Sequence, residues 1–297
     1  MDIKSFVIML YMFSLGGCAT TPPALPMQVL WHDQVFDYDP AFVTVGKQDL
    51  FALDADLLTA LQKARLEKSS QQARFDYLLK LLYTTKNDAN NAEFPYASGQ
   101  STIAAETWQR RRGDCLSLVI MSYSIANALD LHASMQEVPV PYIFDRHGGI
   151  DYVAGHVNLR IKNRSDLRLN ERAGIGDITI DFQPQISVRR TGSTLSEDAI
   201  LARFYNNLAA EYLVKGNLNH AYAHFKAAIM ADAEFAPSYV NLAVIYKRQG
   251  LAQSAERLLA HAIALNGDEI AMDSLHQLLV SQGRNAEAAP YAKLIEA

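Results

Sequence analysis

Apolar residues between positions 57 and 82 fall at the spacing that places side chains on one face of an α-helix. They are Leu57, Leu58, Leu61, Phe75, Leu78, Leu79 and Leu82. This pattern predicts two helices, followed by a polar loop at Asn87 to Asn91. A third helix is predicted to begin after Asp114, because aspartate is a favoured N-cap residue. Its apolar residues cover much of its circumference, as in a buried core helix, and are Leu116, Leu118, Val119, Ile120, Tyr123, Ile125 and Leu129.

Two later segments alternate with a period of two, which indicates β-strands. In residues 153–161, the polar side chains of His156, Asn158 and Arg160 share one face, opposite a face of valine, leucine and isoleucine. In residues 177–182, Asp181 lies opposite the isoleucines. A turn-rich stretch at 171–176 separates the segments, so an antiparallel pair would bring His156 and Asp181 side by side.

The last third of the chain repeats itself at a period of 34 residues. The matching pairs are Tyr205 and Tyr239, Leu208 and Leu242, Ala209 and Ala243, Tyr212 and Tyr246, Gly216 and Gly250, Ala221 and Ala255, and Ala228 and Ala262. A weaker third unit follows one residue early, with Leu275, Leu279, Gly283 and Ala288. This pattern resembles the tetratricopeptide repeat, which implies an all-α solenoid of about three repeats over 199–297, with a groove for a protein partner. His220 and His224 lie four residues apart in it, and we interpret them as packing or surface residues rather than metal ligands.

The N-terminus carries a short apolar run, Ser5 to Leu15, that is too short to span a bilayer. It ends in Leu15-Gly16-Gly17-Cys18, which resembles a bacterial lipoprotein box. The resemblance implies a signal peptide at 1–17, lipidation of Cys18, and attachment to the outer membrane facing the periplasm; a plain secretory signal is the alternative. Residues 18–45 are then a tether and lead-in, beginning with the proline-rich Ala19 to Pro26.

Composition narrows the classes of function. The 297 residues suggest about two domains, and the net charge of -5 gives no reason to expect a nucleic-acid partner. The chain has two cysteines, Cys18 and Cys115, too far apart in sequence for a CxxC metal or redox site. Nucleotide, dinucleotide and serine-hydrolase motifs are missing from the sequence, so we expect neither a cofactor nor a metal.

Cys115 is the candidate nucleophile. It falls in the first turn of the predicted helix, where the free N–H groups and the helix dipole favour a thiolate. Arg110 to Arg112 could strengthen this field, and Gly113 would leave room for a substrate backbone. A cysteine nucleophile also needs an imidazole base and a group that orients it, and His156 and Asp181 are the residues that could meet these needs.

The motifs Arg112-Gly113-Asp114-Cys115-Leu116-Ser117, Gly155-His156-Val157 and Ile180-Asp181-Phe182, in this order, resemble the transglutaminase-like superfamily. The resemblance covers roughly residues 75–190 and implies an α+β papain-like domain, which we place at 46–195. It also implies that Cys115 is the nucleophile, His156 the general base and then acid, and Asp181 the residue that fixes the imidazole tautomer. Gln109 is a candidate for the oxyanion hole, because papain-type proteases carry a glutamine six residues before the cysteine; Trp108 is its rival.

Together these features predict a lipid-anchored enzyme of the bacterial cell envelope. We expect a cysteine peptidase or amidase, with a protein or peptide as substrate and the repeats as a site for a protein partner. Two alternatives stay open. One is a non-catalytic scaffold that holds peptides, and the other is a transglutaminase that cross-links proteins.

Overall fold

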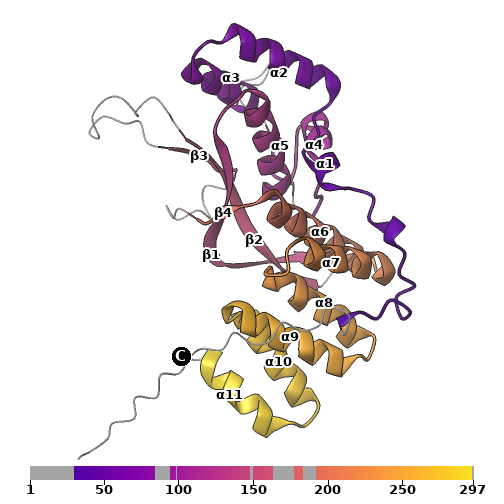
Figure 1. The fold of residues 1–297 in the computed structure, drawn as a ribbon. Coiled ribbons are helices and arrows are strands. Elements are labelled where there is room, and N and C mark those ends of the chain that lie inside the picture. Colours follow the sequence, from indigo (N-terminus) through magenta and orange to yellow (C-terminus); the bar gives the residue numbers. More distant parts are fainter. Residues whose placement is uncertain are drawn as a thin grey trace, which may run out of the picture.

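The chain is described by a computed structural model at residues 30–83, 94–97, 99–147, 150–162, 177–182 and 192–295. It is mostly helical and contains one four-stranded antiparallel sheet (Figure 1). Within the described residues, no helix combines the length and apolar character needed to cross a membrane. The predicted signal peptide, Cys18, the loop at 87–91 and the turn at 171–176 lie outside these residues.

The first half of the chain is a group of helices around a buried central helix. Their bounds are η2 Pro40–Phe42, α1 Lys47–Phe51, α2 Ala55–Glu67, α3 Gln71–Tyr83, α4 Ala104–Arg110 and α5 Cys115–Ala128. Helices α2 and α3 confirm the two helices predicted from leucine spacing, and α5 confirms the third. Helix α5 is buried around most of its circumference, so it forms the centre of this core.

The sheet lies against α5 (Figure 1). Its strands are β1 Ala133–His147, β2 Ile150–Ile161, β3 Ile178–Ile180 and β4 Thr194–Leu195, in the spatial order β3-β2-β1-β4. Strands β2 and β3 are antiparallel, with Leu159 opposite Ile180, and both of these side chains are buried in the core. This register confirms the predicted strand pair and sends Asp181 to the face that carries His156.

Within the part of the chain that the structure describes, six helices follow the sheet in three consecutive pairs. They are α6 Glu197–Val214, α7 Leu218–Ala231, α8 Ala236–Arg248, α9 Ala252–Asn266, α10 Glu269–Ser281 and α11 Asn285–Ile295. The turn inside each pair contains a glycine with positive φ: Gly216 at +75°, Gly250 at +74° and Gly283 at +74°. The turns therefore recur at the spacing found in the sequence, and glycine suits each of them because it adopts this conformation without steric cost.

We call α6 to α11 the helical array, and α1 to α5 with the four strands the sheet-bearing unit. Helix α6 contributes to the cores of both. Ile200 and Phe204 of α6 belong to the core built around α5 and the sheet, whereas Ala209 and Leu213 of the same helix belong to the core of the array. Helix α6, which begins at the predicted boundary between 195 and 199, thus packs against both parts of the chain.

Residues 30–38 are docked on the helical array. Leu30 and Phe36 are buried in its core, and the Phe36 ring stacks on Tyr222 with 4.4 Å between ring centroids. Asp33 accepts a hydrogen bond from Lys226 Nζ at 2.7 Å. From there the chain runs to α1 (Figure 1). The later part of the predicted tether and lead-in at 18–45 is therefore bound to the protein surface.

Candidate active site

The turn that carries Cys115 is held by a network of buried hydrogen bonds. Asp114 caps α5 by accepting from the Ser117 N–H at 2.7 Å. Ser101 Oγ donates to the second oxygen of Asp114 at 2.6 Å, and the Thr102 N–H donates to Ser117 Oγ at 2.9 Å. These bonds fix the loop before α4 against the first turn of α5, so the position of Cys115 is set by both elements.

Gly113 is required by close packing. A Cβ atom at this position would lie 3.0 Å from Ser117 Cβ and 3.3 Å from Thr107 Cγ2. The space beside Gly113 is therefore filled by the protein's own side chains. The prediction that it leaves room for a substrate backbone is wrong.

His156 and Asp181 are in direct contact. Both carboxylate oxygens of Asp181 lie 3.0 Å from Nε2 of His156, and the histidine is only 1% exposed. The other ring nitrogen, Nδ1, is buried and has no hydrogen-bond partner among the described residues. With the Nε2 proton donated to the carboxylate, Nδ1 is left as an acceptor, which is the form that a general base needs.

Cys115 contacts the backbone of Val157, the residue that follows His156 in the chain. The backbone N–H groups of Val157 and Leu116 lie within hydrogen-bonding reach of the sulfur, and the Asp181 carboxylate is close enough to act on it electrostatically. The sulfur makes no hydrogen bond to Nδ1 of His156 in this structure. The three predicted residues thus gather where the start of α5 meets β2 and β3, with one direct contact between them.

The pKa of Cys115 is raised, whereas the sequence predicted a lowered pKa. Burial of the sulfur raises the pKa of Cys115 to about 12, and the neighbouring Asp114 carboxylate acts in the same direction. The N–H groups of Val157 and Leu116 lower it by less. The expected lowering of the pKa is therefore wrong, because desolvation and Asp114 outweigh the helix terminus. A thiol with a pKa this high stays protonated at neutral pH.

Two of the three upstream arginines contact other residues. Arg110 pairs with Glu106 on its own helix, and the Arg111 guanidinium lies 4.0 Å from the centroid of the Phe94 ring. The rings of Trp108 and Phe94 are 6.0 Å apart. Gln109 is exposed on α4 and makes no side-chain hydrogen bond with a described residue. The backbone N–H of Leu116, in the first turn of α5, lies at the Cys115 sulfur and is a further donor that could stabilise an oxyanion.

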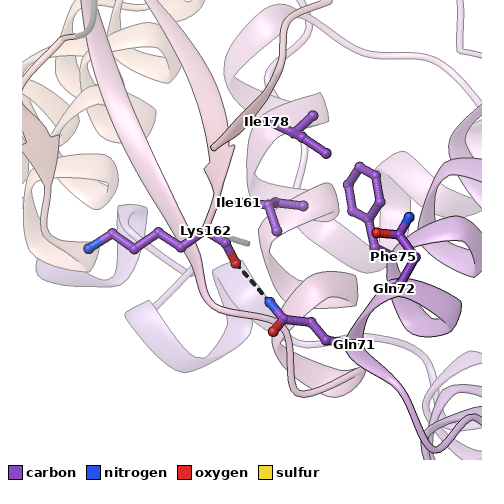
Figure 2. Close-up of a pocket in the computed structure, with 6 residues that line it drawn as sticks. All are labelled: Gln71, Gln72, Phe75, Ile161, Lys162 and Ile178. Atoms are coloured by element: carbon purple, nitrogen blue, oxygen red, sulfur yellow. Dashed lines mark hydrogen bonds between the residues drawn. The ribbon is translucent and has the colours of Figure 1, made fainter. Parts of the chain in front are cut away.

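Two hollows lie near the sheet. One is lined by Leu116, Gly155, Val157, Arg203, Asn206, Asn207 and Phe235. Figure 2 shows the other, where Gln71 donates to the Lys162 carbonyl at 2.7 Å beside Phe75, Ile161 and Ile178. Neither lining contains a cysteine, histidine or carboxylate, and only the first includes sequence neighbours of Cys115 and His156.

His220 and His224 pack among aromatic residues. His220 stacks on Phe42 with 4.1 Å between ring centroids, and Nδ1 of His224 donates to the His220 carbonyl at 2.8 Å. This packing agrees with their interpretation from sequence. Within the described residues, no group of three or more His, Cys, Asp and Glu side chains could hold a metal ion.

Comparison with protein-family models gave no match, and comparison with curated proteins gave none either. The function therefore has to be argued from the residues of the site.

Proposed function

We propose that this protein is a cysteine peptidase or amidase in which Cys115, His156 and Asp181 form the catalytic triad. The observation that carries the proposal is the state of His156. Its Nε2 is held by both oxygens of Asp181 at 3.0 Å, and its Nδ1 is buried and has no hydrogen-bond partner among the described residues. A buried imidazole with one nitrogen oriented and the other available is the arrangement that a thiol nucleophile requires.

The reaction would proceed by acyl transfer. Nδ1 of His156 takes the thiol proton as the Cys115 sulfur bonds to the carbonyl carbon of an amide. The C–N bond then breaks, the imidazolium returns the proton to the departing amine, and a thioester remains. Water, deprotonated by the same nitrogen, attacks the thioester and releases the acid and the thiol. The raised pKa of Cys115 means that the base must act during the attack.

The fold supports this assignment in outline. A helix-borne cysteine followed by a strand-borne histidine and an aspartate at the end of the next strand matches the chain order of the transglutaminase-like superfamily. We propose that residues 46–195 are such a domain and that 199–297 are tetratricopeptide repeats. We also propose lipidation of Cys18 and an outer-membrane location, with hydrolysis favoured over cross-linking because water is the default acceptor.

A labelling experiment tests the triad. In the full chain carrying Cys18→Ser, Cys115 is the single thiol. A peptidyl acyloxymethyl ketone should label Cys115, and His156→Gln should slow labelling about 100-fold or more, because base catalysis contributes about 10² to 10⁴. Asp181→Asn should slow it less, whereas the control Asp177→Asn, which alters an ion pair with Arg160, should not change it. Equal labelling of the wild type and His156→Gln would refute the triad.

One observation favours a second candidate, a non-catalytic lipoprotein that binds peptides. The raised pKa of Cys115 is what an inert buried thiol would have. The two candidates predict different results for a Cys115→Ala strain of the native host. A Cys115→Ala strain should accumulate uncut envelope proteins or peptides if the protein is a hydrolase, as measured by mass spectrometry. An unchanged envelope under all growth conditions would favour the scaffold.

A further inference from the structure

Helix α6 is attached to the sheet-bearing unit by polar contacts at both of its ends. Near its start, Asp198 pairs with Lys47 of α1 at 2.9 Å. Near its end, the Glu211 carboxylate accepts a hydrogen bond from the Ser101 N–H at 2.8 Å. The second contact reaches the loop before α4, which is part of the network that holds the proposed nucleophile.

Glu211 belongs to the part of α6 that lies in the helical array. Ala209 and Leu213, two residues before and after it, are buried in the core of the array. Glu211 itself is partly buried, and its bond to Ser101 joins two residues that are 110 positions apart in the chain. The array therefore supplies an acceptor to a loop of the sheet-bearing unit.

Ser101 connects this contact to the turn that carries Cys115. Its hydroxyl donates to Asp114 Oδ2 at 2.6 Å, and the other oxygen of Asp114 accepts from the Ser117 N–H at 2.7 Å. Ser101 and Asp114 are only 8% and 7% exposed, so their bond lies away from solvent. Hydrogen bonds thus run without interruption from Glu211 to the first turn of α5, the helix that begins with Cys115.

We propose that Glu211 is a positioning residue through which the helical array holds Cys115 in the orientation for attack. This inference rests on the proposed cysteine hydrolase. Without Glu211 the Ser101 N–H loses its acceptor, which costs free energy, and the loop before α4 would shift to relieve that cost. The cap of α5 would move with the loop. Even a small displacement of a nucleophile lowers the rate strongly, because the reacting atoms must meet within a narrow range of distance and angle.

Substitutions of Glu211 test this role in the full chain with Cys18→Ser. The readout is the second-order rate at which the peptidyl acyloxymethyl ketone labels Cys115. We expect Glu211→Ala to slow labelling about tenfold, because a hydrogen bond to a charged group is lost. Glu211→Gln keeps an acceptor oxygen and should bring the rate to within about threefold of the wild type. The matched control, Glu256→Ala, removes a carboxylate that binds Arg284 within the array and should leave the rate unchanged.

A double-mutant cycle tests the route through Ser101. Ser101→Ala alone should also slow labelling about tenfold, because Asp114 loses the hydroxyl that fixes it. In that background the link to Asp114 is already broken, so adding Glu211→Ala should slow labelling by no more than about twofold. An additive effect of the two substitutions would overturn the proposal. Equal slowing by Glu211→Ala and Glu256→Ala would also overturn it, because the effect would then reflect only the stability of the array.

The outcomes separate this proposal from the proposed function. Labelling that requires His156 but is unchanged by Glu211→Ala would overturn the positioning role and leave the hydrolase standing. No labelling of the native protein, with normal alkylation of the denatured chain, would overturn the hydrolase and the positioning role with it.

Discussion

Cys115 lies where two opposing influences on a thiol meet. A helix N-terminus typically favours an anion by about 0.3 to 1 kcal/mol, which is less than one pKa unit. Burial without a cation nearby can raise a pKa by about 3 to 5 units. The comparison explains why the pKa of Cys115 rises to about 12 despite its place in the first turn of α5.

Asp114→Asn should make Cys115 more reactive. Asparagine caps helices as well as aspartate does, so the first turn should persist while the negative charge is lost. Removing a charge that raises the pKa lowers it, and we expect alkylation by iodoacetamide at pH 8 to be about tenfold faster. The rate is measured by mass spectrometry in the chain with Cys18→Ser, with Asp273→Asn on α10 as the control. An unchanged or slower rate would contradict this account.

At this scale, sequence reasoning predicted the pairing of His156 with Asp181 but not the state of Cys115. The pairing follows from strand alternation, which is a local pattern. The pKa depends on how far the folded chain buries the sulfur, and no local pattern contains that information. The hollow that Arg203 and Asn207 line in part was missed for the same reason, because these residues belong to α6.

Helix α5 is positioned by the turn before it as much as by its own apolar faces. Arg111 adopts a left-handed conformation at the end of α4, with φ of 55°. Two residues later Gly113 packs against Ser117 and Thr107, and its carbonyl accepts a hydrogen bond from Ala97 at 2.8 Å. The chain between the two helices therefore has little freedom to move.

Gly113→Ala should destabilise the protein and displace Cys115. The added methyl would lie 3.0 Å from Ser117 Cβ, closer than carbon atoms pack, so the first turn of α5 must shift. We expect a loss of about 1 to 3 kcal/mol in the free energy of unfolding, measured with urea. In Gly155→Ala the new atom would meet Glu137 Oε1 at 3.6 Å, an ordinary contact, and the loss should be smaller. Equal losses in the two variants would contradict this explanation.

The elements that sequence reasoning located have strong periodicity: α2, α3, α5, β2, β3 and the helix pairs. The two-residue strand β4 was not predicted, because such a short strand has no pattern of its own and exists through its pairing with Met135 and Gln136 of β1. The turn glycines of the array were predictable from their spacing alone, since only the conformation of the turn is required of them.

The whole molecule is held together by α6 and by the docked segment at 30–38. Helix α6 contributes to both cores, and Lys47 at the start of α1 pairs with Asp198 at 2.9 Å. Tyr205 donates to the Val45 carbonyl at 2.5 Å. The N-terminal segment thus contacts the array first and then the junction between the array and the sheet-bearing unit. Sequence reasoning treated this stretch as a lead-in, because a run of mixed polar and aromatic residues has no periodicity.

Phe36→Ala should release this segment. Phe36 is fully buried between Tyr222 and Tyr246, so its removal should cost about 3 to 5 kcal/mol. Urea unfolding measures the loss, and limited proteolysis should reveal new cleavage between residues 30 and 45. Val35→Ala, at a side chain that is 47% exposed, should cost less than about 0.5 kcal/mol. A protease-resistant Phe36→Ala protein would contradict the docking.

The docked segment also limits the length of chain that can separate the protein from the membrane. If Cys18 carries a lipid, about 12 residues separate the membrane from Leu30, and a fully extended chain of that length reaches about 40 Å. Leu30 would then stay within about 40 Å of the bilayer. The protein could therefore meet only substrates that come near the membrane surface, whatever their concentration elsewhere in the compartment.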